Sequence, residues 1–272
     1  MLVFLKMKWV SLVLSFVAVG AVLFSIAEEA TERFFPGGRS EIDSEANNRA
    51  AQAIRKWTEP EEWGEDLDPR ESPYFWDFEV VGRPVFLRVL KNSNRDGVVE
   101  AWLEDPTTNR FSHFKSYRVS FFSGELGPKT KQGDLQAPEG FYFISRGRMN
   151  PQSSYHLSMD IGYPNAYDRH HGRTGSLLMI HGKSVSLGCF AMTDASIEQL
   201  YTLVDGALKN GQPFVRVHCF PFAMTEEKLE EHAESEHLEF WENLKEGWDW
   251  FERHKRPPNV EVEEGRYVFL EG

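Results

Sequence analysis

Hydrophobic and polar residues alternate in short runs through the central part of the chain, a pattern typical of half-buried β-strands. Turn-forming residues at 92–97 and 105–109 separate the first three runs, which we interpret as an antiparallel meander with one packed face. The predicted strands are residues 85–90, 98–103, 117–122, 141–145, 155–161, 176–180, 214–220, 260–262 and 267–270.

After residue 192 the alternating pattern ends, and apolar residues recur at the spacing of an α-helix. Thr193 or Asp194 is the predicted N-cap, and Asn210-Gly211 ends the helix. Its apolar stripe consists of Ile197, Leu200, Tyr201, Val204 and Leu208. A second helical region, two or three short helices rich in tryptophan and phenylalanine, is predicted from Thr225 to His254. The pattern therefore predicts a mainly β domain with one core helix and a helical C-terminal extension, which is α+β overall.

The N-terminal region has the features of an export signal. Lys6 and Lys8 precede an apolar run from Trp9 to Ile26, and small residues follow at a position suited to cleavage. The run is long for a signal peptide and close to the minimum for a membrane span, so residues 1–27 are either a cleaved signal or a retained anchor. Export is expected in both cases, with membrane contact only through this segment if it stays uncleaved.

Residues 28–75 carry more acidic than basic side chains and contain no motif. We interpret this region as an acidic linker with one short helix at Ser44–Trp57. The composition of the whole chain gives a net charge of -12. An acidic protein without a basic stripe is poorly suited to nucleic acid, and we expect none as a partner.

The residues that point to chemistry lie between 181 and 194. His181 and Cys189 are eight positions apart and each stands beside a glycine. A catalytic cysteine needs a base or a positive field, and His181 is the candidate base. The helix that begins a few residues later is expected to favour the thiolate of Cys189. Gly188 allows backbone amides to approach a substrate oxygen, as an oxyanion hole requires.

This stretch, His-Gly followed by Ser-x-Gly-Cys, resembles the signature of the L,D-transpeptidase (YkuD-type) catalytic domain. Further motifs are similar to the YafK-type subgroup of that family. These motifs are Gly-Pro-Lys at 127–129, Gln-Gly-Asp at 132–134, Ala-Pro-Glu-Gly-Phe-Tyr at 137–142 and Tyr-Pro-Asn-Ala-Tyr-Asp-Arg at 163–169. The resemblance implies a YkuD-like β-sandwich or barrel as the catalytic domain over residues 76–224, with residues 225–272 packed on it as the extension.

The resemblance also implies an activity. A periplasmic cysteine enzyme would act on peptidoglycan stem peptides at the diaminopimelate centre, through an acyl-enzyme on Cys189. An amine acceptor would give wall cross-links, whereas water would make the enzyme a hydrolase that releases wall-bound lipoprotein. The third interpretation is a non-catalytic wall-binding module. No metal or cofactor is expected.

The same resemblance assigns roles to individual residues. Cys189, His181 and Gly182 are the expected catalytic residues, and the backbone amides of Leu187, Gly188 and Cys189 would form the oxyanion hole. Two positions depart from the family pattern: Leu187 stands in place of a second histidine and Ala191 in place of an arginine. Another cation must therefore hold a substrate carboxylate.

Arg169 is our candidate for that cation, because its five-donor fork suits carboxylates. Tyr163 and Ser186, which lie in the matching motifs, are assigned as further substrate contacts. We interpret Lys129 as an ordinary surface charge and Cys219 as a buried thiol. Neither is expected to react.

Overall fold

The computed structural model describes residues 39–58, 80–92 and 96–271. The chain divides into two units, 1–48 and 49–272, and the second unit carries the sheets and the candidate site. Helix α2 (Arg39–Thr58) contains the predicted helix Ser44–Trp57. The segment 1–27 and most of the predicted linker lie outside the described residues. None of the helices in the described ranges is long and apolar enough to span a membrane.

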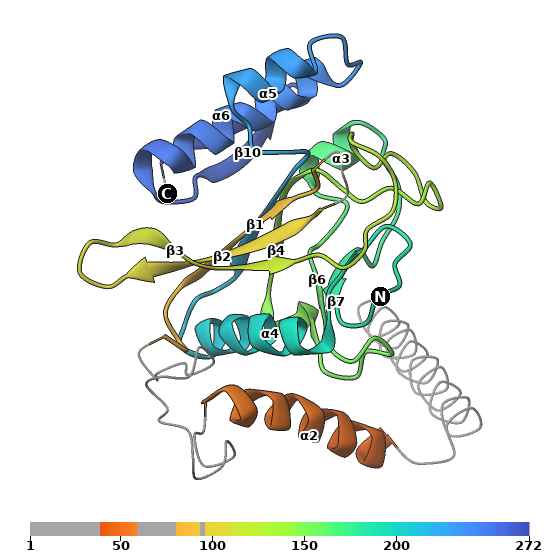
Figure 1. Cartoon of the computed structure of the whole chain (residues 1–272), viewed down its shortest axis with the longest axis vertical. Coiled ribbons are helices and arrows are strands. Elements are labelled where there is room, and N and C mark those ends of the chain that lie inside the picture. The colour runs from red at the N-terminus through yellow and green to blue at the C-terminus, as the bar shows by residue number, and fades with distance from the viewer. Residues whose placement is uncertain (1–38, 59–79, 93–95, 272) are drawn as a thin grey trace, which may run out of the picture. The chain divides into compact units, whose positions relative to one another are not determined.

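A five-stranded sheet forms the centre of the second unit (Figure 1), in the order β3-β2-β1-β9-β4. Its strands are β1 (Val85–Leu90), β2 (Val98–Asp105), β3 (Arg110–Arg118), β4 (Gly140–Ile144) and β9 (Val215–Phe220). The predicted meander β1-β2-β3 is confirmed, and β1 also pairs in parallel with β9.

The third strand begins at Arg110, earlier than the predicted run 117–122. The side chain of Asp105 accepts hydrogen bonds from the backbone N–H groups of Thr107 and Thr108. This tight turn reverses the chain at once, so the strand starts directly after it. The third predicted strand was therefore misplaced.

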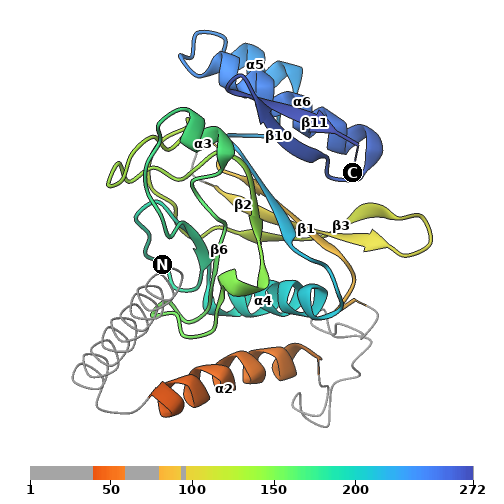
Figure 2. The same ribbon diagram turned by 180° about the vertical axis from the view of Figure 1, so that it is seen from behind.

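Alternate residues of the sheet face two different cores. On one face, Val85, Leu87 and Val217 pack with helix α4 (Asp194–Lys209) in the main core. Figure 2 shows α4 beside this face of the sheet. The helix begins as predicted, because the Thr193 hydroxyl accepts the N–H of Ser196 at the N-cap.

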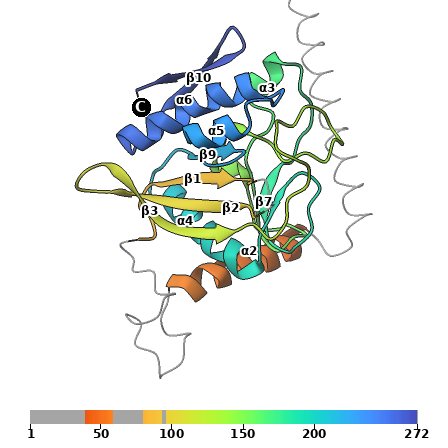
Figure 3. The same cartoon turned by 45° about the horizontal axis from the view of Figure 1, so that its top comes forward.

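The opposite face is covered by the C-terminal extension. It consists of α5 (Glu226–Glu231), α6 (Leu238–His254) and the hairpin β10 (Asn259–Glu263) with β11 (Arg266–Leu270). Figure 3 shows the hairpin lying along α6. Phe141, Phe220 and Trp248 pack in the core beneath this extension. The helices and the closing hairpin predicted after Thr225 are confirmed.

A buried ion pair joins the extension to the sheet. Lys91 and Glu139 are both fully buried, and the Lys91 ammonium lies 2.9 Å from the Glu139 carboxylate. The same ammonium donates to the carbonyl oxygens of Gly127 and Ala137, and the indole N–H of Trp241 donates to Glu139. The loop at 127, strand β4 and helix α6 thus share one polar network.

A second sheet of four short strands positions the candidate site. Its order is β5 (Met149–Asn150), β6 (Ser158–Asp160), β7 (Met179–His181) and β8 (Phe190–Ala191). β7 and β8 are parallel, with Ile180 paired to Phe190 and His181 to Ala191. The two sheets, with the helices between and outside them, give the predicted α+β fold.

Candidate functional site

Two neighbouring strands bring His181 and Cys189 into one region. His181 is the last residue of β7 and Cys189 is the residue before β8. Because His181 pairs with Ala191, Cys189 lies two positions earlier along the adjacent strand. Successive side chains of a strand alternate between its two faces, so a side chain two positions from Ala191 lies on the same face of the strand pair as that of His181.

The His181 ring is fixed in an orientation suited to a base. Its Nδ1 lies 2.6 Å from the carbonyl oxygen of Gly182, which only accepts, so Nδ1 carries the proton. The lone pair is then on Nε2. The ring of Tyr155 lies against the imidazole, with 4.7 Å between the ring centroids. Burial lowers the pKa of His181 below its ordinary value, against the opposing effect of the Gly182 bond.

Gly182 has no room for a side chain. A Cβ at this position would lie 2.7 Å from the carbonyl oxygen of Tyr155 and 2.7 Å from the Asp194 carboxylate. Its own N–H donates to the carbonyl oxygen of Leu157. Gly182 therefore lets the chain pass through a crowded position while its carbonyl orients His181.

The Cys189 thiol is held by the backbone of the strand next to it. Its sulfur accepts the N–H of Met179 at 3.4 Å and donates to the carbonyl oxygen of Leu177 at 3.5 Å. No hydrogen bond joins the thiol to His181 among the described residues. Such bonds are often absent before substrate binds, and a rotation of the Cys189 side chain would be needed to form one.

The pKa of Cys189 is raised above its ordinary value, mainly by burial. The N–H of Met179 and the charge of Lys129 act in the opposite direction, whereas the charge of Asp160 adds to the rise. The expectation that the following helix would favour a thiolate is therefore wrong. α4 begins only at Asp194, and the helix field fades within a turn. Both pKa shifts favour the neutral forms, a thiol at Cys189 and an imidazole at His181.

Lys129 is the charged residue that the sequence reading missed. It is only 5% exposed, so its interpretation as a surface charge was wrong. The ammonium pairs with Asp134 and donates to the carbonyl oxygen of Lys131. Asp134 also accepts three backbone N–H groups of the same loop, and its pKa falls to about 2 although burial opposes the shift. The charge of this buried, ion-paired lysine is among the effects that lower the pKa of Cys189. In the sequence, the Gly-Pro-Lys motif was the only feature that pointed to Lys129.

The loop before Cys189 is tied down at two points. The N–H of Gly188 donates to the Ser123 hydroxyl at 2.7 Å, and that hydroxyl donates to the carbonyl oxygen of Leu135. The Ser186 hydroxyl donates to the carbonyl oxygen of Cys189 at 2.6 Å. Gly188 therefore uses its N–H within the protein, which leaves Leu187 and Cys189 as the candidate oxyanion donors. Ser186, predicted to contact substrate, holds the loop in this structure.

Large apolar side chains around this loop are exposed to solvent. The exposed fraction is 65% for Leu177, 61% for Val185 and 78% for Leu187. Leu177 is also the residue whose carbonyl accepts the thiol. The segments directly before and after β7 thus expose apolar surface close in sequence to Cys189.

The other predicted substrate residues, Tyr163 and Arg169, form no hydrogen bond with the thiol in the part of the chain that the structure describes. Tyr163 is buried, and its hydroxyl donates to the carbonyl oxygen of Lys129 at 3.2 Å. Its contact thus supports the Lys129 loop. Arg169 lies on helix α3 (Ala166–His170), donates to the carbonyl oxygen of Pro164 and lines a cavity that Cys189 and His181 do not line. Its role toward a carboxylate remains a prediction.

Both cysteines are free, and Cys219 is buried in β9 as predicted. Among the described residues, no group of three or more His, Cys, Asp or Glu side chains could hold a metal ion.

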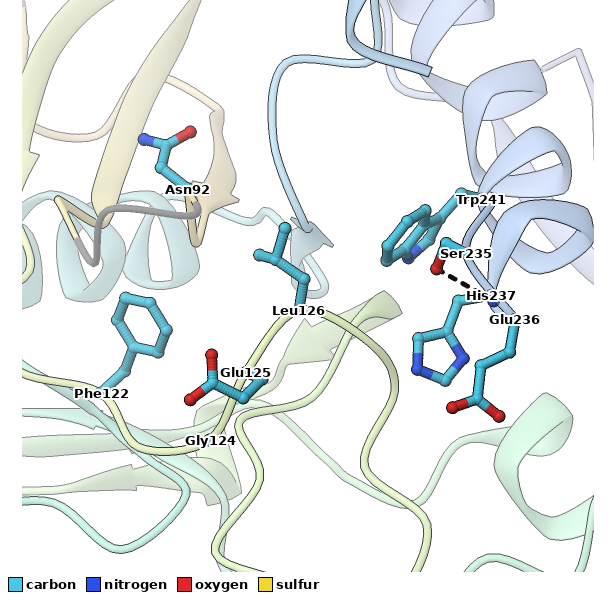
Figure 4. A pocket seen from close by; sticks show the side chains of 9 residues that line it. All are labelled: Asn92, Phe122, Gly124, Glu125, Leu126, Ser235, Glu236, His237 and Trp241. Carbon is cyan, nitrogen blue, oxygen red and sulfur yellow. Dashed lines mark hydrogen bonds between the residues drawn. The ribbon is translucent and has the colours of Figure 1, made fainter. Parts of the chain in front are cut away.

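A cavity of about 460 Å³ opens between residues 122–126 and the C-terminal extension (Figure 4). Phe122 precedes the serine that binds the Gly188 N–H, so this cavity lies beside the site loop. Glu125, Glu236 and His237 line it, together with Trp241. Two carboxylates make this cavity unsuited to anionic ligands.

Comparisons with known proteins identify the family of this chain. Residues 109–218 match the family model described as the L,D-transpeptidase catalytic domain, YkuD. The proteins named "Putative L,D-transpeptidase YafK" from Escherichia coli strain K12 and from Escherichia coli O157:H7 are each 42% identical over 190 residues. These residues cover 70% of this chain and 75% of each relative.

Two solved structures of the helical cell shape determining protein Pgp2 from Campylobacter jejuni were also found. The K307A mutant is 18% identical and the other structure 19%, each with a TM-score of 0.40. The matches cover 68% and 71% of this chain and 74% and 80% of the Pgp2 chains. On the strength of the sequence relatives, this chain belongs to the L,D-transpeptidase family with a YkuD catalytic domain. It is an enzyme of a family that acts on peptidoglycan peptides.

Proposed function

We propose that the protein is a periplasmic cysteine acyltransferase whose nucleophile is Cys189 and whose base is His181. The observation that carries the proposal is the orientation of His181. Its Nδ1–H is held by the Gly182 carbonyl, which leaves Nε2 unprotonated and able to accept a proton. A neutral thiol and a neutral imidazole match a mechanism in which the proton moves as the sulfur attacks.

The first half-reaction uses an amide at the diaminopimelate centre of a stem peptide as the donor. The Cys189 sulfur forms a bond to the amide carbon while His181 Nε2 takes the thiol proton. The backbone N–H groups of Leu187 and Cys189 stabilise the oxyanion. Collapse of this intermediate breaks the carbon–nitrogen bond, and His181 returns the proton to the leaving amine. A thioester on Cys189 remains.

The second half-reaction transfers the acyl group to an amine or to water. An amine attacks the thioester and gives up a proton to His181, and the thiolate leaves and is reprotonated. The product is a cross-link if the amine belongs to another stem peptide. Water in the same place gives a free carboxylate.

A specific observation favours a protein-bearing donor as the second candidate. Leu177, Val185 and Leu187 expose apolar surface around the thiol, which a short carboxylate-rich peptide does not need. A wall-attached lipoprotein would cover this surface with its own apolar residues. Release of that lipoprotein by hydrolysis is the reaction this surface would support.

The test uses purified protein and the variants C189A and C219A. A carbapenem should add its mass to the wild type and to C219A but not to C189A. Absence of the adduct from wild type, or its presence in C189A, would refute the nucleophile. C219A is the matched control because Cys219 is the other thiol of the chain and is buried.

Incubation with wall sacculi that carry lipoprotein then separates the acceptors. Released lipoprotein indicates water as the acceptor, whereas new cross-links between stem peptides indicate an amine. A protein that forms the adduct but yields neither product would contradict the proposed substrate.

A further inference from the structure

A second cavity, of about 580 Å³, lies between the edge of the five-stranded sheet and the C-terminal hairpin. Three arginines line it: Arg148 at the end of the 3-10 helix η2 (Arg146–Arg148), Arg169 on α3 and Arg216 on β9. We call it the arginine cavity. In a chain with a net charge of -12, three guanidinium groups around one cavity form a local reversal of charge.

None of these three arginines forms an ion pair with any described residue. Arg148 donates to the carbonyl oxygen of Phe143 at 2.6 Å, Arg169 to that of Pro164, and Arg216 to the side-chain oxygen of Asn259. Each guanidinium has five N–H donors, so most of these N–H groups remain available to a ligand. Arg216 is also partly buried, and that burial lowers its pKa. The cavity thus holds positive charge that the protein does not neutralise by direct pairing.

The guanidinium of Arg148 is packed directly against the backbone. A Cβ added at Gly162 would lie 1.9 Å from one of its nitrogens, so a larger residue there would displace the guanidinium. The same guanidinium lies 4.3 Å from the centroid of the Phe143 ring. Arg148 is therefore held in place by a flat aromatic face and a bare backbone, as a preorganised binding group is.

His218 adds a buried polar atom to the wall. The side chain is 1% exposed, and its Nδ1 has no hydrogen-bond partner among the described residues. Phe86 and Phe141 enclose the ring at centroid distances of 4.7 Å each, and burial keeps its pKa well below the ordinary value. The wall of the cavity thus contains a buried polar atom for which the described residues supply no partner.

The arginine cavity is separate from the thiol site. His218 and Arg216 alternate along β9 with Val215 and Val217, which face the main core. The site strands pack into that main core through Ile180 and Phe190. The cavity therefore opens on the opposite face of the five-stranded sheet. Its remaining charged residues, Glu261 and Glu271, are exposed and form no ion pair with the arginines.

From this arrangement we infer that the arginine cavity binds a peptide bearing two or more free carboxylates. Arginine forks recognise carboxylates and phosphates in the same bidentate way. The three arginines come from three elements around a volume much larger than one phosphate, which suits several carboxylates spaced along a flexible chain. The identification of this peptide as a second stem peptide of the wall rests on the proposed function. The cavity would then hold the enzyme on the polymer while Cys189 acts on another stem.

The test is titration calorimetry of the full chain carrying C189A with a soluble tetrapeptide that contains diaminopimelate. Two molecules of peptide should bind per protein. The double variant R148Q/R216Q should weaken the second site at least tenfold, and R118Q should not, because Arg118 is an exposed arginine far along the sheet. R148K/R216K keeps the charge without the fork, and intermediate binding is expected.

Some results would overturn the inference. Binding of one peptide per protein, or unchanged binding in the double variant, excludes this site. If inorganic phosphate bound more tightly than the tetrapeptide, the occupant of the cavity would be phosphate and not a peptide that carries carboxylates. The thiol is assayed separately, with Cys189 restored: R148Q/R216Q should still form the carbapenem adduct. A chain that binds two peptides but forms no adduct would refute the proposed function and keep the cavity.

Discussion

The backbone N–H of Gly188 donates a hydrogen bond of 2.7 Å to the hydroxyl of Ser123, a residue sixty-five positions earlier in the chain. Ser123 donates in turn to the carbonyl oxygen of Leu135. One hydroxyl thus links the residue before the nucleophile to the loop that carries Lys129 and Asp134. Any loss of this link should reach both the thiol and its neighbouring cation.

Replacing Ser123 with alanine should slow acylation of Cys189 about tenfold and lower the free energy of unfolding by about 1 kcal/mol. The reason is that the Gly188 N–H loses its partner and the loop before Cys189 gains freedom. Rates of adduct formation and urea denaturation give the two numbers. S120A, which changes an exposed serine three residues earlier, should leave both unchanged. An unchanged acylation rate in S123A would show that the link is structural only.

Replacing Lys129 with methionine should raise the pKa of the Cys189 thiol further, because the cation that opposes burial is removed. The pH dependence of alkylation by iodoacetamide measures this pKa. K131M is the matched control, since Lys131 is exposed on the same loop. A shift of equal size in both variants would mean that Lys129 acts only through the overall charge.

The rate of Cys189 acylation should change with pH on the acidic side of neutrality, through His181, and on the basic side, through Cys189. His181 has a lowered pKa, so its base form persists to lower pH than that of an ordinary histidine, and activity should fall only below that ordinary value. Cys189 has a raised pKa, so its thiolate should form only above the ordinary thiol value. Alkylation should therefore be slow at neutral pH. Rapid alkylation at pH 7 would instead show a preformed ion pair.

Substituting alanine for Gly182 should lower kcat for acyl transfer at least a hundredfold, because a Cβ would collide with the Tyr155 carbonyl and displace the group that orients His181. Circular dichroism and the carbapenem adduct separate folding from chemistry. G147A is the matched control, since a Cβ there meets no atom within 4 Å. Normal kcat in G182A would remove the Gly182 carbonyl from the mechanism.

Removing Lys91 should be costly for folding. K91M leaves Glu139 buried without its partner, and we expect a loss of about 3–5 kcal/mol in the free energy of unfolding. The control K209M breaks an exposed pair with Asp205 and should cost about 0.5 kcal/mol or less. Urea denaturation measures both. Similar losses in the two variants would contradict the role of the Lys91–Glu139 pair as the buried link to the C-terminal extension.

Local pattern was sufficient to predict most of the secondary structure. β1 covers the predicted residues 85–90, and α4 begins at the predicted N-cap Thr193. These features depend on nearby residues: alternation every second position, and a side chain that satisfies the first free N–H groups of a helix. The placement of His181 at the end of a strand was also predictable, because residues 176–180 form a short, largely apolar run that ends directly before it.

Burial and long-range proximity were decided by the tertiary structure. Nothing local distinguishes Lys129, which is buried against Asp134, from Lys131, which is exposed on the same loop. Arg169 was recognised as a carboxylate binder from its chemistry alone. Only the fold places it with Arg148 and with Arg216, which lies forty-seven residues after Arg169 in the chain. The pKa of the Cys189 thiol likewise depends on burial among segments distant in sequence. Electric fields and desolvation act through space, so the chain had to be folded before they could be assigned.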